Sequence, residues 1–126
     1  MKQAGARVRA RAVTAQAGKP TLDKRPLISQ AQAHALVVLF KVLANDSRLR
    51  LLHALERRRE VSVGDLADTV GMRPQAVSNQ LQRLVDRRIL NARRDGNRIF
   101  YSIADPCVTS LLDLALCLIE ETGQAK

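Results

Sequence analysis

Two cysteines near the end of the chain, Cys107 and Cys117, are the residues best suited to chemistry. Thiolates bind soft or borderline ions such as As(III), Cd, Pb or Zn in preference to Mg or Ca. Under oxidants the same thiols form a disulfide or a polysulfide. A third interpretation is that both cysteines are small apolar residues that only fill space, as free cysteines often do. The sequence leaves these three roles open.

The spacing of the two thiols restricts how they can act together. Ten residues on one helix correspond to about 15 Å along the axis and about 80° around it, so one helix cannot hold an ion between both sulfurs. If the last helices of two subunits pack antiparallel, Cys107 of one subunit can approach Cys117 of the other, with Asp105 and Glu121 nearby. A metal or redox site built from these residues is therefore expected between subunits.

A second set of candidate residues lies on a helix predicted from Pro74 to about Arg87. Its apolar residues recur at helical spacing and form one stripe, made of Val77, Leu81, Leu84 and Val85. Amide, hydroxyl and guanidinium groups can hydrogen-bond base edges in the major groove of duplex DNA. Such groups occupy the face opposite the stripe and the residue before the helix: Arg73, Gln75, Ser78, Asn79, Gln82 and Arg83. The alternative is an ordinary solvated helix face.

A hairpin is predicted directly after this helix. Segments 89–93 and 98–103 have strand character and flank Asp95-Gly96-Asn97, a sequence typical of tight turns. Three arginines on the hairpin could lie along phosphates or in a narrow minor groove: Arg93, Arg94 and Arg98. A short helix, a turn containing Gly71, a second helix and a hairpin together predict a winged helix-turn-helix.

Four helices are predicted besides the one that begins at Pro74. The first begins at a capping box formed by Ser29 and Gln32 and ends near Ala44. The second is capped within residues 45–47, with an apolar stripe of Leu49, Leu52 and Leu55. The third runs from Ser62 to about Val70, and the last from Asp105 and Pro106 to about Glu121. The fold class is thus mainly α with a small β-hairpin, about five helices and a two-stranded wing.

The last predicted helix is apolar nearly all round, so it must be buried. Its expected partners are the first helix and a second copy of itself, which predicts a homodimer formed through the first and last helices. Residues 1–28 are expected to form a basic, flexible arm, residues 29–122 the DNA-binding and dimerisation domain, and residues 123–126 a tail. The arm is either a solvated tail or a phosphate-contacting segment.

Composition favours nucleic acid as the partner. The 126 residues are 46% hydrophobic, enough for one domain with a core, and carry a formal charge of +9. With two Phe and one Tyr, the chain lacks the rings on which unpaired bases stack, so double-stranded DNA is the expected ligand. The apolar stretches are too short to cross a membrane, and two cysteines without a secretory signal indicate the cytoplasm, with free thiols.

Three segments carry a family resemblance: "FKVLANDSRLRLLHAL", "VSVGDLADTVGMRPQAVSNQLQRLVDRRIL" and "RRDGNRIFYSIADPCV". Together they resemble the ArsR/SmtB family of metal- and redox-responsive repressors over about residues 36–121. The resemblance implies a homodimer on a two-fold symmetric operator, which an inducer releases. It also shows departures: Ser62 and Gly64 stand where many members carry ligand cysteines in the third helix. On the last helix, Asp105-x-Cys107 matches the start of an Asp-x-His site, but Leu118 falls where a second His would be.

The predicted function is that of a sequence-specific transcriptional repressor, released from operator DNA by a thiol-directed ion. A redox or reactive-sulfur sensor using Cys107 and Cys117, or a repressor without a small-molecule sensor, remains as an alternative. An architectural DNA binder would share the charge but need no sensor. A thiol enzyme is not expected, because neither a nucleophile elbow nor a phosphate-binding glycine loop is present. No ion is expected to be required for folding.

Overall fold

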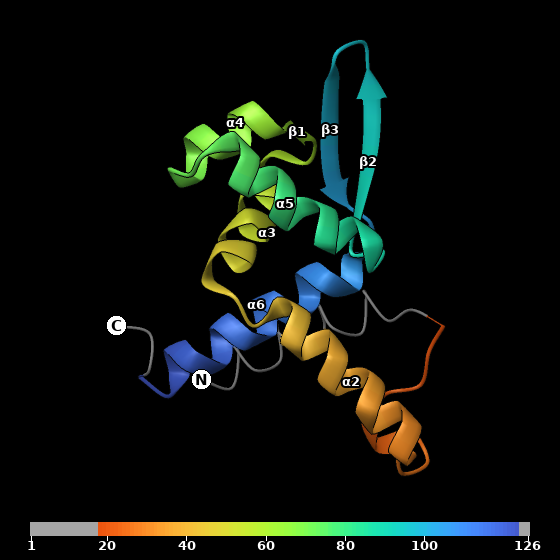
Figure 1. The fold of residues 1–126 in the computed structure, drawn as a ribbon. Coiled ribbons are helices and arrows are strands. Elements are labelled where there is room, and N and C mark those ends of the chain that lie inside the picture. The colour runs from red at the N-terminus through yellow and green to blue at the C-terminus, as the bar shows by residue number, and fades with distance from the viewer. Residues whose placement is uncertain (1–17, 124–126) are drawn as a thin grey trace. The chain divides into compact units, whose positions relative to one another are not determined.

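Helices make up most of the described residues, 18–123, of the computed structural model. The elements follow in the order η1 (Leu22–Lys24), α2 (Gln30–Leu43), α3 (Asp46–Arg58), β1 (Val61–Ser62), α4 (Val63–Val70), α5 (Pro74–Asp86), β2 (Leu90–Asp95), β3 (Arg98–Ile103) and α6 (Pro106–Glu121) (Figure 1). The predicted winged helix-turn-helix, mainly helical with a hairpin, is confirmed.

Local side-chain caps explain where the helices begin. The Ser29 hydroxyl accepts a bond from the backbone N–H of Gln32 at 3.1 Å, and the Gln32 side chain accepts one from the backbone N–H of Ser29 at 2.9 Å, so the predicted capping box is confirmed. Asn45 caps α3, Ser62 caps α4 and Asp105 caps α6 through side-chain oxygens. The expected helix boundaries are therefore correct to within a residue or two.

Residues 28–104 form one compact unit whose core lies between α3, α4, α5 and the strands. Its fully buried side chains are Leu51, Leu52, Leu55, Val61, Leu66, Val77, Leu81, Leu84 and Leu90. The predicted stripe of α3 was wrong at one position, because Leu49 is 37% exposed. Since α3 contacts α4, α5 and β3, its buried face is centred on the Leu51 and Leu52 pair and leaves Leu49 outside.

The sheet has three antiparallel strands in the order β1-β3-β2, where the sequence predicted two. Val61 pairs with Tyr101 and Ser62 with Phe100, so β1 adds a short outer strand to the hairpin. A two-residue strand is too short to show the alternation by which strands are recognised. In the hairpin, Asp95 pairs with Arg98 across a two-residue turn, and β2 and β3 extend beyond α4 and α5 (Figure 1).

A second unit contains residues 18–27 and 105–123 of the described chain. None of the residues of α6 is buried, although the helix is rich in apolar side chains, and its predicted burial against a second copy stays a prediction. Of the predicted arm, residues 1–17 lie outside the described residues, as do 124–126 of the tail. Within residues 18–123, no helix combines the length and apolar character needed to traverse a bilayer.

Candidate nucleic-acid interface and thiol pair

A tight turn joins α4 to α5 and sets the start of the candidate DNA-contacting helix. Gly71 ends α4 with φ +69°, a left-handed conformation that glycine adopts without strain. The N–H groups of Gly71 and Met72 both donate to the Ala67 carbonyl, at 2.9 and 3.0 Å. Two residues later Pro74 occupies the first turn of α5, and α4 packs against α5. This is the arrangement of a helix-turn-helix.

Helix α5 presents the two faces that its sequence predicts. Val77, Leu81 and Leu84 are buried, whereas Val85 is half-buried. The structure places the candidate DNA-contacting residues on the other side: Arg73, Gln75, Asn79, Gln82 and Arg83 are exposed, and Ser78 is half-buried. Their hydrogen-bonding groups are therefore accessible to a ligand in solution.

Three of the exposed amide side chains are already hydrogen-bonded along the helix. Gln75 donates from Nε2 to Oδ1 of Asn79 at 3.2 Å, and Gln82 donates from Nε2 to Oδ1 of Asp86 at 2.9 Å. The first bond leaves the Asn79 amide nitrogen free to donate, while the second holds the Gln82 amide against a carboxylate. Gln75 and Asn79 are thus better placed than Gln82 to pair with a base.

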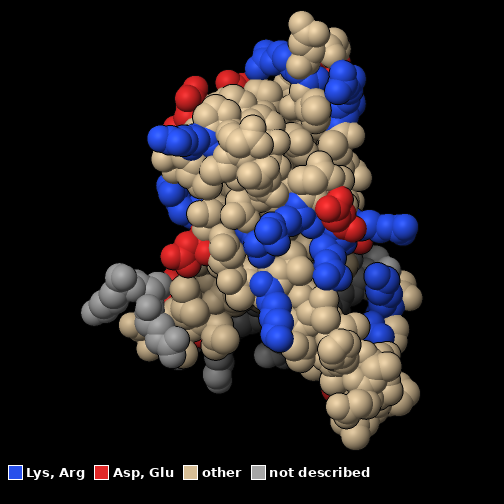
Figure 2. All heavy atoms as spheres, viewed as in Figure 1, with Lys and Arg blue, Asp and Glu red and all other residues tan. Residues whose placement is uncertain are grey.

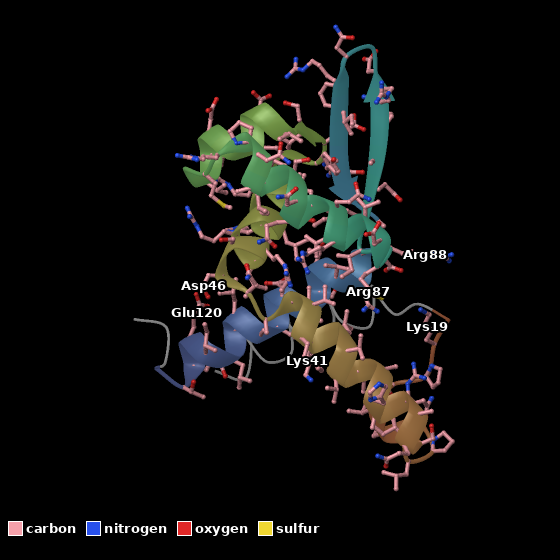
Figure 3. The ribbon with its side chains drawn as sticks, viewed as in Figure 1. Lys19, Lys41, Asp46, Arg87, Arg88 and Glu120 are labelled. Atoms are coloured by element: carbon pink, nitrogen blue, oxygen red, sulfur yellow. The ribbon has the colours of Figure 1, made fainter. Side chains whose placement is uncertain are left out.

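Basic side chains continue past the end of α5. Figure 3 shows Arg87 and Arg88 at the carboxyl end of this helix, and Figure 2 shows Lys and Arg side chains there and around the tip of the hairpin. Arg87 and Arg88 are both exposed. Arg88 has φ +62° at the point where the chain leaves the helix. These two arginines were absent from the predicted site, although the concentration of charge after Arg83 could have indicated them.

The structure separates the three hairpin arginines by face. Arg93 pairs with Phe100 across the strands, and its guanidinium donates to both carboxylate oxygens of Glu60, each at 2.9 Å. This pairing lowers the pKa of Glu60 below its ordinary value, chiefly through the hydrogen bond, and raises that of Arg93. The positive charge of Arg93 is therefore already paired with a carboxylate within the chain.

Arg98 lies on the same face of the hairpin as Arg93. Its Nη2 donates to the Ser62 hydroxyl at 2.9 Å and lies 3.7 Å from a carboxylate oxygen of Asp65. The guanidinium carbons of Arg93 and Arg98 lie 5.1 and 5.3 Å from the centroid of the Phe100 ring, within the range of cation–π attraction. Both arginines thus brace the hairpin against the rest of its unit.

Arg94 lies on the opposite face of the hairpin. It pairs with Ile99, and strand alternation puts it on the same side as the buried Leu90 and Tyr101. Among residues 18–123 no hydrogen bond or ion pair joins the exposed Arg94 side chain to another group. Of the three arginines, Arg94 is the one whose full charge is available to a phosphate.

Sequence reasoning missed the groups that brace the hairpin, namely Glu60, Asp65 and Phe100. Glu60 and Arg93 are 33 positions apart, and no local pattern marks them as partners. The one usable signal was Phe100, which closely follows three arginines in a chain with two Phe.

The candidate sensing residues form two separate pairs on α6. The Asp105 carboxylate accepts from the backbone N–H of Cys107 at 2.8 Å, and the Cys117 thiol donates to Glu121 over 3.8 Å. Neither cysteine forms a disulfide within the described residues, and both are half-buried. Within the described residues no group of three or more His, Cys, Asp or Glu side chains is placed to hold a metal ion. Because Cys107 and Cys117 are ten residues apart on one helix, about 15 Å along its axis, one chain does not bring the two thiols together.

Asp105 also controls the ionisation of the nearer thiol. A hydrogen bond to Asp105 raises the pKa of Cys107, and burial acts in the same direction. The backbone N–H and the thiol of Cys107 in turn lower the pKa of Asp105. Cys107 is thus a protonated thiol at neutral pH, and an ion that binds its sulfur must displace the proton.

Comparison with known proteins finds transcriptional regulators. The model of the MarR family matches residues 45–97, which run from α3 to the hairpin turn. A transcriptional repressor SmtB homolog of Synechocystis is 41% identical over 85 residues, covering 68% of this chain and 64% of the relative. The HTH-type transcriptional regulator NmtR of Mycobacterium tuberculosis is 42% identical over 91 residues, covering 72% of this chain and 74% of the relative. These relatives are DNA-binding regulators rather than enzymes.

Two solved structures extend the comparison. The antimony-specific transcriptional repressor AntR is 65% identical, with a TM-score of 0.73, and the match covers 86% of this chain and 97% of AntR. The homodimeric winged helix-turn-helix DNA-binding domain Mb0332 from Mycobacterium bovis is 32% identical, with a TM-score of 0.63, and the match covers 77% of this chain and 92% of that domain.

Proposed function

This chain belongs to the ArsR/SmtB family of winged helix-turn-helix repressors, and on that premise we propose that it is a homodimeric transcriptional repressor released from operator DNA by a trivalent metalloid, antimony or arsenic. The observation that carries the DNA-binding part is the accessible polar face of α5, backed by the buried stripe of Val77, Leu81 and Leu84. Seated in the major groove, that face supplies base contacts, and the hairpin supplies phosphate contacts.

The exposed apolar surface of two helices supports the dimer. Leu36, Val37 and Phe40 of α2 are 41%, 46% and 51% exposed, and Leu118 of α6 is 63% exposed. Apolar side chains grouped on a helix in this way mark an interaction surface. The homodimeric state of the Mycobacterium bovis domain makes a second copy of this chain the partner that we propose.

The proposed inducer follows from the thiols and from the AntR comparison. Cys107 and Cys117 offer soft sulfur ligands, which suit antimony and arsenic better than oxygen-preferring ions. A dimer that pairs two α6 helices antiparallel would bring the Cys107 and Asp105 pair of one subunit toward the Cys117 and Glu121 pair of the other. Two equivalent sites would then lie at the subunit boundary, and an ion bound there would alter how the two DNA-contacting units are held.

The proposal is tested by fluorescence anisotropy of reduced protein on a duplex that footprinting has identified as its operator. Antimonyl tartrate and arsenite should release wild-type protein, whereas Cys107→Ser and Cys117→Ser should bind the operator normally and resist release. Ser110→Ala, a half-buried change on the same helix, should respond as wild type. A normal inducer response in both cysteine variants would remove the thiol site from the proposal.

The same titration distinguishes the redox alternative, which is supported by two half-buried cysteines that are not joined in a disulfide. A polysulfide donor would oxidise the two thiols to an inter-subunit disulfide, and the electrons would reduce the polysulfide. Release by the polysulfide but not by either metalloid, with a covalent dimer on a non-reducing gel, would replace the metalloid proposal by this one.

A further inference from the structure

Arg48, in the first turn of α3, hydrogen-bonds two other helices at once through its side chain. Its Nε donates to Oε1 of Gln80 on α5 at 2.7 Å, and its Nη1 donates to the Val42 carbonyl on α2 at 2.8 Å. Its backbone N–H donates to the Asn45 side chain that caps α3, at 3.0 Å. The residue is half-buried, so water competes only partly for these bonds.

The bond from Arg48 to Val42 stabilises the carboxyl end of α2. The last four carbonyls of a helix lack partners within it, and together they give that end a partial negative charge. Val42 is the next-to-last residue of α2, and the Arg48 guanidinium supplies a cation to its carbonyl. Hydrogen bonds with a charged donor are roughly twice as strong as neutral ones.

Helix α2 has few other attachments to its unit. Of its residues, Leu43 alone is buried, while Leu36, Val37 and Phe40 are exposed for the proposed contact with a second subunit. The α2 part of the proposed dimer surface is therefore connected to α5 through the short segment between α2 and α3 and through Arg48. We expect that loss of these bonds would change the angle between α2 and α5.

We propose that Arg48 is a positioning residue that sets the distance between the two α5 helices of the dimer, and hence the operator spacing that the repressor accepts. The inference rests on the proposed function. A two-fold dimer contacts half-sites whose centres lie about one helical turn of DNA apart, so a rotation of α5 about the end of α2 changes the spacing that fits. Base recognition within each half-site depends on Gln75 and Asn79 and stays intact.

The experiment measures full-chain binding to the operator and to two altered duplexes, with one base pair added or removed between the half-sites. Arg48→Met keeps the volume and removes the donors, and we expect it to lower the preference for native spacing by about tenfold or more, with binding to a random duplex unchanged. Arg50→Met is the matched control. Arg50 also lies on α3 and donates to a helix-terminal carbonyl, that of Val70, at 3.1 Å, but it does not bond α2 or α5.

A second variant keeps the proposal testable if Arg48→Met does not fold. Gln80→Leu removes only the acceptor on α5, and it should also reduce the spacing preference while leaving the dimer intact in analytical ultracentrifugation. If folded Arg48→Met and Gln80→Leu both keep the wild-type preference for the native spacing, the proposed role of Arg48 is wrong, and the proposed repressor function is unaffected. Wild-type protein that binds every duplex equally overturns both this inference and the proposed repressor function.

Discussion

The ion pair between Glu60 and Arg93 crosses over the central strand of the sheet. Glu60 immediately precedes β1, Arg93 lies on β2, and both strands pair with β3 between them. The ring of Phe100, on β3, lies 5.1 Å from the guanidinium carbon of Arg93. One pair of side chains therefore joins the two outer strands across the middle one, midway along the hairpin.

The Glu60 carboxyl should titrate below its ordinary pKa of 4.5, because Arg93 stabilises the charged form. A carboxyl with a lowered folded-state pKa contributes stability above its unfolded pKa and loses it as the pH falls through the folded value, so the brace should persist at neutral pH. NMR titration of the Glu60 side chain checks this. Arg93→Gln should move the pKa back toward 4.5 and Arg94→Gln should not; an unshifted Glu60 in wild-type protein would contradict the brace.

Arg94 and Arg93 should differ in their effect on salt dependence. If Arg94 binds a phosphate, Arg94→Gln should reduce the slope of log affinity against log salt by about 0.9 for each phosphate that the variant no longer neutralises. Arg93→Gln should weaken binding with a smaller change in slope, because its charge is already paired with Glu60. Anisotropy titrations between about 50 and about 200 mM salt measure both slopes. Equal slopes in the two variants would show that Arg93 and Arg94 contribute equally to phosphate binding, although they lie on opposite faces of the hairpin.

Asn79→Ala should weaken operator binding by about 1–3 kcal/mol while leaving binding to random duplex nearly unchanged, because the substitution removes a hydrogen bond to a base and keeps the phosphate-binding groups. Gln82→Ala should cost less, since its amide is held by Asp86. Competition titrations with operator and random DNA give both quantities. If Asn79→Ala weakens binding to all duplexes equally, Asn79 contacts the DNA backbone and not a base.

Leu81→Ala should destabilise the fold by about 2–5 kcal/mol, because this fully buried side chain leaves a cavity between α5 and its neighbours. Leu49→Ala is the matched control on α3, and its 37% exposure should keep its cost well below that of Leu81→Ala. Urea unfolding monitored by circular dichroism compares the two. Similar costs would mean that Leu49 is covered in the dimer, which the same measurement at several protein concentrations would reveal.

Local chemistry explains why much of the fold could be predicted from the sequence. The Ser29 capping box, the left-handed Gly71 and the tight turn at Gly96 each act through residues a few positions apart. The two faces of α5 follow from the spacing of Val77, Leu81 and Leu84 alone. Elements fixed by short-range patterns were therefore correct.

The errors and omissions involve residues far apart in the chain. Strand β1 exists only because β3 pairs with it, and Arg48 and Gln80 meet although 32 positions separate them. The division of the hairpin arginines depends on strand register and on acidic partners outside the hairpin, which composition does not reveal. The candidate thiols stay a prediction because their proposed site needs residues from two subunits.

The turn that delivers Glu60 to its partner is made by an arginine where glycine would be free of strain. Arg59 has φ +71° and ψ −60°, and the Glu60 N–H donates to the Arg58 carbonyl at 2.8 Å, a γ-turn that side chains disfavour. Such backbone strain costs of order 1–3 kcal/mol. Glycine would remove it, and the gain in stability is partly offset because glycine raises the conformational entropy of the unfolded chain. Arg59→Gly should therefore raise the melting temperature, measured by calorimetry, and would give biosensor engineering a sturdier scaffold without altering any DNA-facing residue.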